Sequence, residues 1–218
     1  MKRNPKGQSF TEYALIIGLV VIITMGVLAA TGISISDLYC QAISALGGDR
    51  CQLAETELSD WNEIYGNWRY EDGVVCGEYD GRTFAENFSG DDYVINVDSV
   101  TLSQGNGYGI YFRTSDEAAV NGYNFQYDPG WGEGAFLFRK WVNGYELSPI
   151  AVKKMPNYDW HGPSRNIQIK VIGNTFTAFI DGEEVLSVSD DTYSEGGVGL
   201  RTWNGTQACF DGVSVTSP

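Results

Sequence analysis

An uncharged stretch near the start of the chain places the strongest constraint on its fold. Tyr13–Ser36 is 24 residues long and contains no charged side chain. A helix of that length can cross a hydrocarbon layer of about 30 Å. Glu12 stands directly before the stretch, and a carboxylate at a membrane edge is costly unless it has a specific partner. The sequence therefore predicts a long hydrophobic helix whose first residues have a role of their own.

Two ordinary explanations of this segment leave Glu12 without a role. A basic head at residues 2–6 followed by an apolar run is typical of a secretory signal peptide, here with cleavage near Ala29 or Ala30. A plain transmembrane anchor with a cytoplasmic basic head is the other interpretation.

Composition restricts the class of the remaining chain. The 218 residues are 43% hydrophobic and 19% charged, enough for a sizeable core. A net charge of -14, from 14 basic and 28 acidic residues, argues against nucleic acid as a partner, because phosphate binding requires clustered Lys and Arg. Glycine, tyrosine and tryptophan are abundant, and turn residues recur after position 60, which is typical of a β-sandwich or barrel.

The four cysteines are Cys40, Cys51, Cys76 and Cys209, and no two of them form a C-x-x-C pair. Their spacing favours disulfides over a zinc ribbon or a thioredoxin-like redox site. The most economical pairing is Cys40 with Cys51 and Cys76 with Cys209. Four buried free thiols are the alternative.

Beyond residue 57 the hydrophobic pattern alternates, with a two-residue period. In Asn166–Val188, for example, Ile167, Ile169 and Val171 alternate with polar residues, and Asp181-Gly182 is a strong hairpin signal. About ten strands are predicted: Trp68–Val75, Tyr93–Thr101, Gly109–Thr114, Tyr123–Tyr127, Ala135–Val142, Asn166–Ile172, Thr175–Ile180, Glu184–Val188, Gly197–Trp203 and Gln207–Val215. The expected class is α+β overall, with a long N-terminal hydrophobic helix followed by an all-β two-sheet sandwich, for which a resemblance given below implies a jelly roll.

The N-terminal residues resemble a class III type IV prepilin, of the Flp (Tad) branch. The resemblance covers residues 1–48 and rests on Lys6-Gly7, Gln8-Ser9-Phe10-Thr11-Glu12-Tyr13 and the apolar run that follows. It implies cleavage by a prepilin peptidase between Gly7 and Gln8, and a filament core in which Glu12, next to Tyr13, pairs with the amino group of a neighbouring subunit. The chain departs from the family in size, because Flp pilins are little more than the helix.

That resemblance implies the following organisation. Residues 1–7 are a leader, 8–48 a helix that is transmembrane before assembly, 49–56 a linker and 57–218 a head domain. The partners would be further copies of the chain, the peptidase and the pilus assembly machinery. The location would be an extracellular filament on a prokaryotic cell, reached from the cytoplasmic membrane.

The head resembles the concanavalin A-like lectin/glucanase jelly roll, in its laminin G-like forms. The residues that carry the likeness are DWNEIYGNWRYEDGVV, GYGIYFRTSD, IKVIGNTFTAFIDGEEV and GGVGLRTWNGTQACFDGVSV. Because this fold includes lectins, enzymes and inert spacers, it identifies no activity.

The sequence predicts no enzyme. Retaining glycosidases place two carboxylates about 5 to 5.5 Å apart, and no E-x-D-x-x-E motif occurs. The adjacent acids Asp116-Glu117, Glu183-Glu184 and Asp190-Asp191 are interpreted as solvated turn charges. His161 is the only histidine, so neither a Ser-His-Asp triad nor a histidine-based metal site is predicted.

No cofactor is predicted, and calcium is the one ion considered. Asp91, Asp92 and Asp211 could supply oxygen ligands, although ordinary turn acids are the favoured interpretation.

Carbohydrate binding is the sharper hypothesis for the head. Aromatic residues concentrate between 120 and 160, in a segment rich in glycine, asparagine and aspartate. Exposed rings can stack on sugars, whereas the competing interpretation is that most of them are core. The predicted glycan-binding residues are Tyr127, Trp131, Trp141, Tyr158 and Trp160. Because the chain is acidic, a neutral polysaccharide is the expected ligand.

Two sequons, at Asn87 and Asn204, are candidate glycosylation sites. The preferred reading of the whole chain is a pilin with a lectin-like head. The alternatives are a membrane-anchored or secreted carbohydrate-binding module that does not polymerise, and a cell-surface glycosidase.

Overall fold

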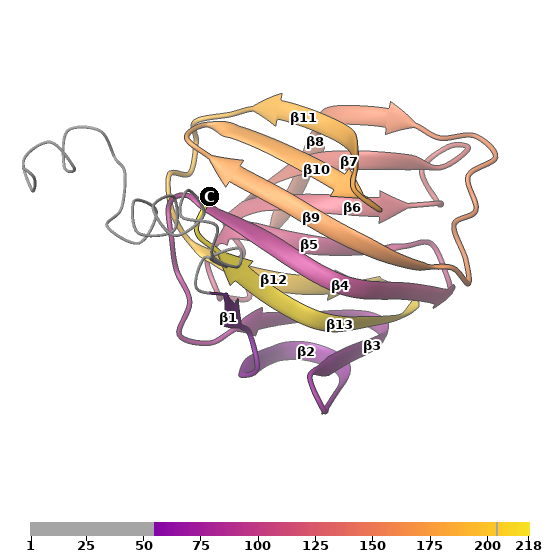
Figure 1. The fold of residues 1–218 in the computed structure, drawn as a ribbon, viewed down its shortest axis with the longest axis horizontal. Coiled ribbons are helices and arrows are strands. Elements are labelled where there is room, and N and C mark those ends of the chain that lie inside the picture. The colour runs from indigo at the N-terminus through magenta and orange to yellow at the C-terminus, as the bar shows by residue number, and fades with distance from the viewer. Residues whose placement is uncertain (1–54, 204) are drawn as a thin grey trace, which may run out of the picture. The chain divides into compact units, whose positions relative to one another are not determined.

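The computed structural model describes residues 55–203 and 205–218, all as strands, turns and loops (Figure 1). The strands are β1 (Thr56–Glu57), β2 (Trp61–Glu71), β3 (Val74–Ala85), β4 (Tyr93–Gln104), β5 (Tyr108–Thr114), β6 (Gly122–Asp128), β7 (Ala135–Val142), β8 (Tyr145–Lys154), β9 (Ser164–Ile172), β10 (Thr175–Ile180), β11 (Glu183–Ser189), β12 (Gly197–Thr202) and β13 (Gln207–Thr216).

The expected α+β class is wrong for this part of the chain, which is an all-β jelly-roll sandwich. The alternation of apolar and polar residues suits a pleated strand with one face in the core. The helix was predicted from residues 8–48, which lie outside the described residues. Within 55–203 and 205–218, no helix is long and apolar enough to cross a membrane.

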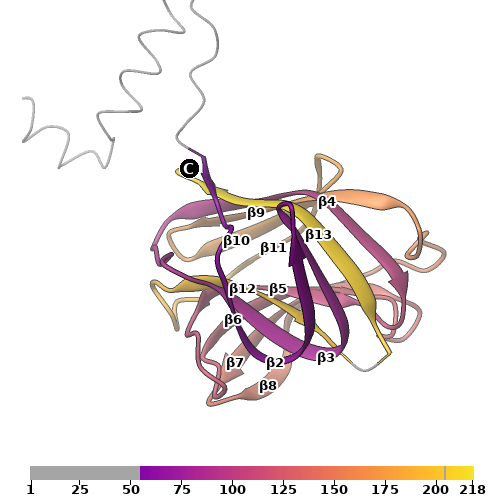
Figure 2. The same cartoon turned by 90° about the horizontal axis from the view of Figure 1, so that it is seen from below.

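The strands form two layers within one hydrogen-bonded path. The order is β11-β10-β9-β4-β13-β3-β12-β5-β6-β7-β8, and β1 and β2 pair with β13 and β3. Figure 2 shows β4, β9 and β13 on one side of the sandwich and β12, β5 and β6 on the other. Strand β3 joins the layers, because its two halves pair with different strands. Its first part, beginning with Val74 opposite Asp211, pairs with β13, and its later part, beginning with Gly81 opposite Thr202, pairs with β12.

Asp-Gly pairs form two hairpin turns, of which only one was predicted. Asp181-Gly182 connects β10 to β11, with φ values of 52° and 80°. Asp72-Gly73 has φ values of 50° and 81° and makes the same turn between β2 and β3. The single strand predicted at Trp68–Val75 is therefore two strands of a hairpin. Strand β8, which was not predicted, extends the second layer beyond β7.

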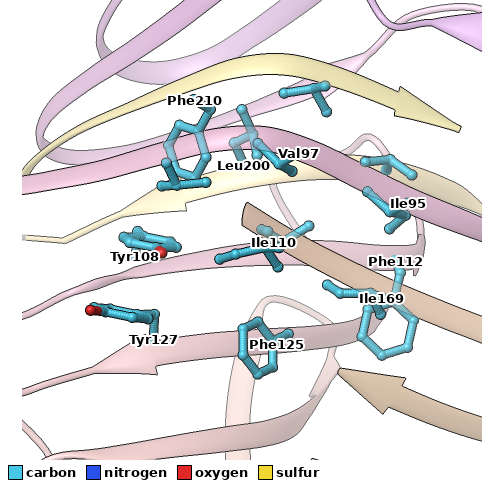
Figure 3. Packing of buried hydrophobic residues seen from close by; sticks show 14 of the residues in the cluster. Ile95, Val97, Tyr108, Ile110, Phe112, Phe125, Tyr127, Ile169, Leu200 and Phe210 are labelled. Carbon is cyan, nitrogen blue, oxygen red and sulfur yellow. The ribbon is translucent and has the colours of Figure 1, made fainter. Parts of the chain in front are cut away.

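Aromatic and branched aliphatic side chains fill the space between the layers (Figure 3). Phe112 lies 4.9 Å from Phe176 of the opposite layer, measured between ring centroids. Tyr108 and Tyr127, on neighbouring strands, stack with centroids 4.9 Å apart. The core thus holds the layers together through side chains distant in sequence.

The disulfide predicted between Cys76 and Cys209 is confirmed. The two residues are directly opposite on β3 and β13, with Cα atoms 4.1 Å apart. The predicted Cys40–Cys51 link lies outside the described residues.

Candidate functional site

The side chains on both faces of strands β5 and β6 are buried, although only one face of each strand meets the core. Tyr123, Phe125 and Tyr127 of β6 point into the core, whereas Asn124 and Gln126 point away from it. We call the side of the second layer that faces away from the core the outer face. Its side chains, matched by strand register, are Arg82 and Phe84 of β3, Arg201 of β12, Tyr111 of β5, Asn124 and Gln126 of β6, and Arg139 and Trp141 of β7.

Two glycines make room on the outer face. A Cβ atom at Gly109 would lie 2.5 Å from Nδ2 of Asn124, and one at Gly199 would lie 2.3 Å from a ring carbon of Phe84. Real Cβ contacts are essentially never so short, so a side chain at either position would have to displace the Asn124 amide or the Phe84 ring. The Asn124 amide therefore occupies the space above Gly109, between Arg201 and Gln126.

A charged network crosses the centre of this face. The Glu146 carboxylate, on β8, accepts a hydrogen bond from Nη1 of Arg201 at 3.0 Å. It also forms an ion pair with Arg139, whose Nε lies 3.0 Å from Oε1 of Glu146. It also accepts from Nε2 of Gln126 at 2.5 Å. The Oε1 atom of Gln126 accepts in turn from Nε of Arg139 at 2.8 Å. Each member of the network is thus hydrogen-bonded or ion-paired to at least one other member.

Aromatic rings flank the three arginines. The Arg139 guanidinium carbon lies 4.6 Å from the Trp131 ring centroid. That of Arg201 lies 4.7 Å from Trp141 and 5.1 Å from Trp203. That of Arg82 lies 4.5 Å from Trp141. These are cation–π distances.

Hydrogen-bonding atoms without a partner gather at the same place. Among the described residues, nine buried side-chain nitrogen and oxygen atoms lack a partner within the protein, and six belong to the outer face. They are Nε of Arg82, Oη of Tyr111, Nδ2 and Oδ1 of Asn124, Nε1 of Trp141 and Nε of Arg201. A buried polar atom without a partner costs about 1–3 kcal/mol, so folded proteins keep few of them. Such a concentration is typical of a site that is completed by a ligand or by bound water.

One carboxyl group beside the outer face has a perturbed pKa. Burial raises the pKa of Asp128, at the end of β6, to about 6, even though backbone N–H groups of Gly130 and Trp131 donate to it. The charge of Arg139 lowers this pKa and that of Glu146 raises it. Burial also raises the pKa of the Tyr111 hydroxyl, which therefore remains protonated at neutral pH.

The five residues predicted to bind glycan divide between this face and the interior. Trp131 is 38% exposed and Trp141 is 2% exposed, and both contact outer-face arginines. Tyr127 is buried, because β6 turns its odd-numbered residues inward, and Trp160 and the half-buried Tyr158 pack against it with centroids 4.7 and 6.0 Å away. Tyr127 and Trp160 are therefore not available as a stacking surface, whereas Tyr158 is partly exposed.

Residues that the sequence did not suggest make most of the outer face. Arg82, Tyr111, Asn124 and Arg201 were missed, because they lie on strands that are far apart in the chain. One signal was available: Asn124 and Gln126 alternate with three aromatic residues in a strand buried on both faces, where a polar side chain requires a partner.

The structure separates the proposed calcium ligands. Asp211 is opposite Ser99 in the middle of β4, whereas Asp91 and Asp92 precede that strand. Six or more strand residues, or about 20 Å, lie between them. Asp92 pairs instead with Arg113 at 3.2 Å. In the described part of the chain, no group of three or more His, Cys, Asp or Glu side chains could hold a metal ion.

The acids interpreted as turn charges are exposed with one exception. Asp116-Glu117 and Glu183-Glu184 are exposed. Asp190 is not simply solvated: Nζ of Lys140 donates to it at 2.6 Å, and the Tyr123 hydroxyl does so at 2.6 Å. Although burial works to raise the pKa of Asp190, these hydrogen bonds hold it well below its usual value.

Asn87 is exposed and lines a pocket of about 590 Å³ next to Phe84. The second sequon residue, Asn204, lies outside the described residues. So do Gly7, Gln8, Glu12 and Tyr13, on which the pilin hypothesis depends.

Comparison with known proteins identifies the family of this domain. The model of the 3-keto-alpha-glucoside-1,2-lyase-like domain family matches residues 53–216. Levanase of Bacillus subtilis (strain 168) is 31% identical over 169 residues, which are 74% of this chain and 23% of that enzyme. The chain thus spans about a quarter of the levanase.

Two solved structures extend the comparison. Carbohydrate-binding module CBM66 from Bacillus subtilis has a TM-score of 0.63 and 26% identity, over 73% of this chain and 97% of that module. A β-1,3-1,4-glucanase from a mouse hindgut metagenome has a TM-score of 0.54 and 13% identity over 76% of this chain and 99% of its own, which shows a shared fold only. Because the family model matches three quarters of its length, the chain belongs to the 3-keto-alpha-glucoside-1,2-lyase-like domain family.

Proposed function

We propose that residues 54–218 form a carbohydrate-binding module whose ligand lies on the outer face. The observation that carries the proposal is the group of six unpartnered polar atoms among tryptophan rings. Sugars present hydroxyl groups along their edges and apolar C–H faces above and below the ring. A surface that combines amide, guanidinium and indole groups is suited to both, because polar groups orient the hydroxyls while aromatic rings pack on the faces.

The similarity to carbohydrate-binding module CBM66 supports binding rather than catalysis. That module is matched over 97% of its length, whereas only 23% of the levanase is matched. The likeness to the levanase therefore covers only a part of that enzyme, whereas the likeness to CBM66 covers the whole module. Because levanase is named for levan, levan is the first polysaccharide to test.

Trp131 offers the cleanest test, because it is exposed and its loss leaves the core intact. We expect Trp131→Ala to weaken binding to a polysaccharide ligand about 3- to 10-fold, since one aromatic contact contributes about 0.5–1.5 kcal/mol. Affinity electrophoresis against a panel that includes levan measures the change.

Phe179→Ala is the matched control. Phe179 also stacks with a cation, Lys170 at 4.8 Å, but it lies on β10 in the other layer. Equal weakening by both variants would show that binding does not use the outer face.

Cleavage of a glycoside is the second candidate function. Asp128, whose pKa burial raises to about 6, and Glu146, which forms ion pairs with two arginines, place two carboxyl groups at the outer face. Acid–base chemistry on sugars uses such pairs. Release of reducing sugar from the polysaccharide that binds, and its loss in Asp128→Asn, would favour this function over binding alone.

We place the module outside the cytoplasm, because the Cys76–Cys209 disulfide requires an oxidising compartment to persist. The filament role predicted from residues 1–48 gains no support from the comparisons, since the family match begins at residue 53. N-terminal sequencing of the mature protein tests how the chain is processed: a start at Gln8 supports the pilin, one near Ala30 a secreted module, and an intact Met1 an anchor.

A further inference from the structure

Arg82 is a buried cation without a counter-charge. It is 8% exposed, and none of the ion pairs found within 55–203 and 205–218 includes it. Its guanidinium donates through Nη1 to the Ala118 carbonyl at 3.3 Å and lies over the rings of Trp141 and Tyr65. Burial of an unpaired charge is costly, because neither a carbonyl nor a ring replaces an anion.

A second arginine stands directly beside it. Arg82 on β3 and Arg201 on β12 are cross-strand partners. Like charges directly opposite each other are destabilising. Glu146 neutralises Arg201, but it is already shared with Arg139. The pair therefore retains an excess positive charge in a chain whose net charge is -14.

The unpartnered atoms around Trp141 are mostly donors. Nε of Arg82, Nε of Arg201 and Nε1 of Trp141 can only donate a hydrogen bond. The two guanidinium carbons lie 4.5 and 4.7 Å from the Trp141 ring centroid, so all three donors share one neighbourhood. A group that satisfies them must accept several hydrogen bonds, and a negative charge would strengthen each one. A carboxylate meets both requirements, whereas a sugar hydroxyl carries no charge.

We propose that the carbohydrate recognised by the outer face is acidic, and that Arg82 together with Arg201 binds its carboxylate. This inference rests on the proposed function and names its ligand class. It replaces the neutral polysaccharide that was expected from the overall charge. Net charge is a sum over the whole chain, but a bound group interacts mainly with charges within about 10 Å.

A polysaccharide and its ester provide the test. Polygalacturonate and fully methyl-esterified polygalacturonate share one backbone and differ in the charge of the carboxyl group. With the full-length chain, isothermal titration should show at least about 10-fold tighter binding of the acid form, because charge-assisted hydrogen bonds are stronger than neutral ones. Raising the salt concentration should reduce the difference.

Two variants locate the effect. Arg82→Gln should remove most of the preference for the acid form, whereas Arg69→Gln should leave it unchanged. Arg69 is an exposed arginine on β2 whose partner is Glu78 at 3.2 Å. Thermal unfolding of each variant verifies its fold, and the acid-to-ester comparison on the unmodified chain needs no variant at all.

The outcomes separate the two proposals. If levan or the ester binds as tightly as the acid form and Arg82→Gln has no effect, the acidic ligand is overturned. The carbohydrate-binding function would then still stand. Failure to bind any polysaccharide, acidic or neutral, would overturn both.

Discussion

Single residues on the outer face combine functions that local sequence does not reveal. Trp141 packs against the Tyr111 ring, with centroids 5.7 Å apart, and also lies within cation–π distance of two arginines. Its indole N–H is left without a partner. The residue thus belongs to a small apolar cluster with Phe84 and Val120 and to the polar surface above it.

Asp128 gives a residue-scale prediction about pH. Its folded-state pKa of about 6 is above the ordinary value of 3.8, so the folded protein favours the protonated form. The stability that Asp128 contributes is therefore present below its unfolded pKa and is lost as pH rises through about 6. Asp128→Asn removes this loss. After allowance for partial exposure to solvent, we expect it to stabilise the protein by about 1 kcal/mol at neutral pH and by less at about pH 4.

Thermal unfolding at several pH values measures the difference between Asp128→Asn and the unmodified protein. Asp116→Asn, at an exposed carboxylate, is the control. A difference that is constant with pH would contradict the assignment of the raised pKa to Asp128.

At the scale of elements, β3 is the strand that connects the two layers of the sandwich. It pairs with β13 in one layer and β12 in the other, and β2 pairs along its other edge from Val74 to Ala85. Between the two pairings Tyr79 has a φ of 63°, a conformation in which a non-glycine residue is uncommon. The chain bends where strand pairing changes partner, and Cys76 lies in the β13 half of this strand.

Removal of the β3–β13 disulfide should weaken this connection. Cys76 and Cys209 are 133 residues apart, so their link restricts a long segment of the unfolded chain. We expect the Cys76→Ser, Cys209→Ser double variant to lose about 2–4 kcal/mol of unfolding free energy without a change of fold. Urea denaturation measures the loss. An unaltered midpoint would show that β-pairing alone fixes these strands.

For the described domain as a whole, the main core is one cluster of buried side chains drawn from both layers. Strands β11 and β8 are the two ends of the hydrogen-bonded path. Between their layers, Nζ of Lys140 on β7 contacts the Asp190 carboxylate just after β11 at 2.6 Å. An ion pair thus links the two end regions of the path.

A domain-scale prediction follows for residues 54–218 expressed alone. This fragment is one compact unit that contains every buried residue of the described core. We expect it to fold cooperatively and to be monomeric, because its core needs nothing from outside. Sedimentation velocity and thermal unfolding test both points. A molten or strongly self-associating fragment would show that residues before 54 are needed to complete the fold.

The sequence by itself determined the features that depend on neighbouring residues. Alternation in Asn166–Ile172, the Asp181-Gly182 turn and the jelly-roll class of the head are local patterns, and the structure shows each of them. The Cys76–Cys209 link was also accessible, because few pairings of four cysteines are economical. The Asp72-Gly73 turn has the same residue pattern and was equally predictable, but it was not predicted.

The tertiary structure alone decided which face of each strand meets the core and what covers the other. Alternation separates Tyr127 from Gln126, but only pairing with distant strands buries the first and leaves the second on the outer face. The Arg82–Arg201 pair joins positions on strands β3 and β12, and no short-range pattern marks it. Long-range strand register sets these contacts, because one shift of register would exchange the two faces.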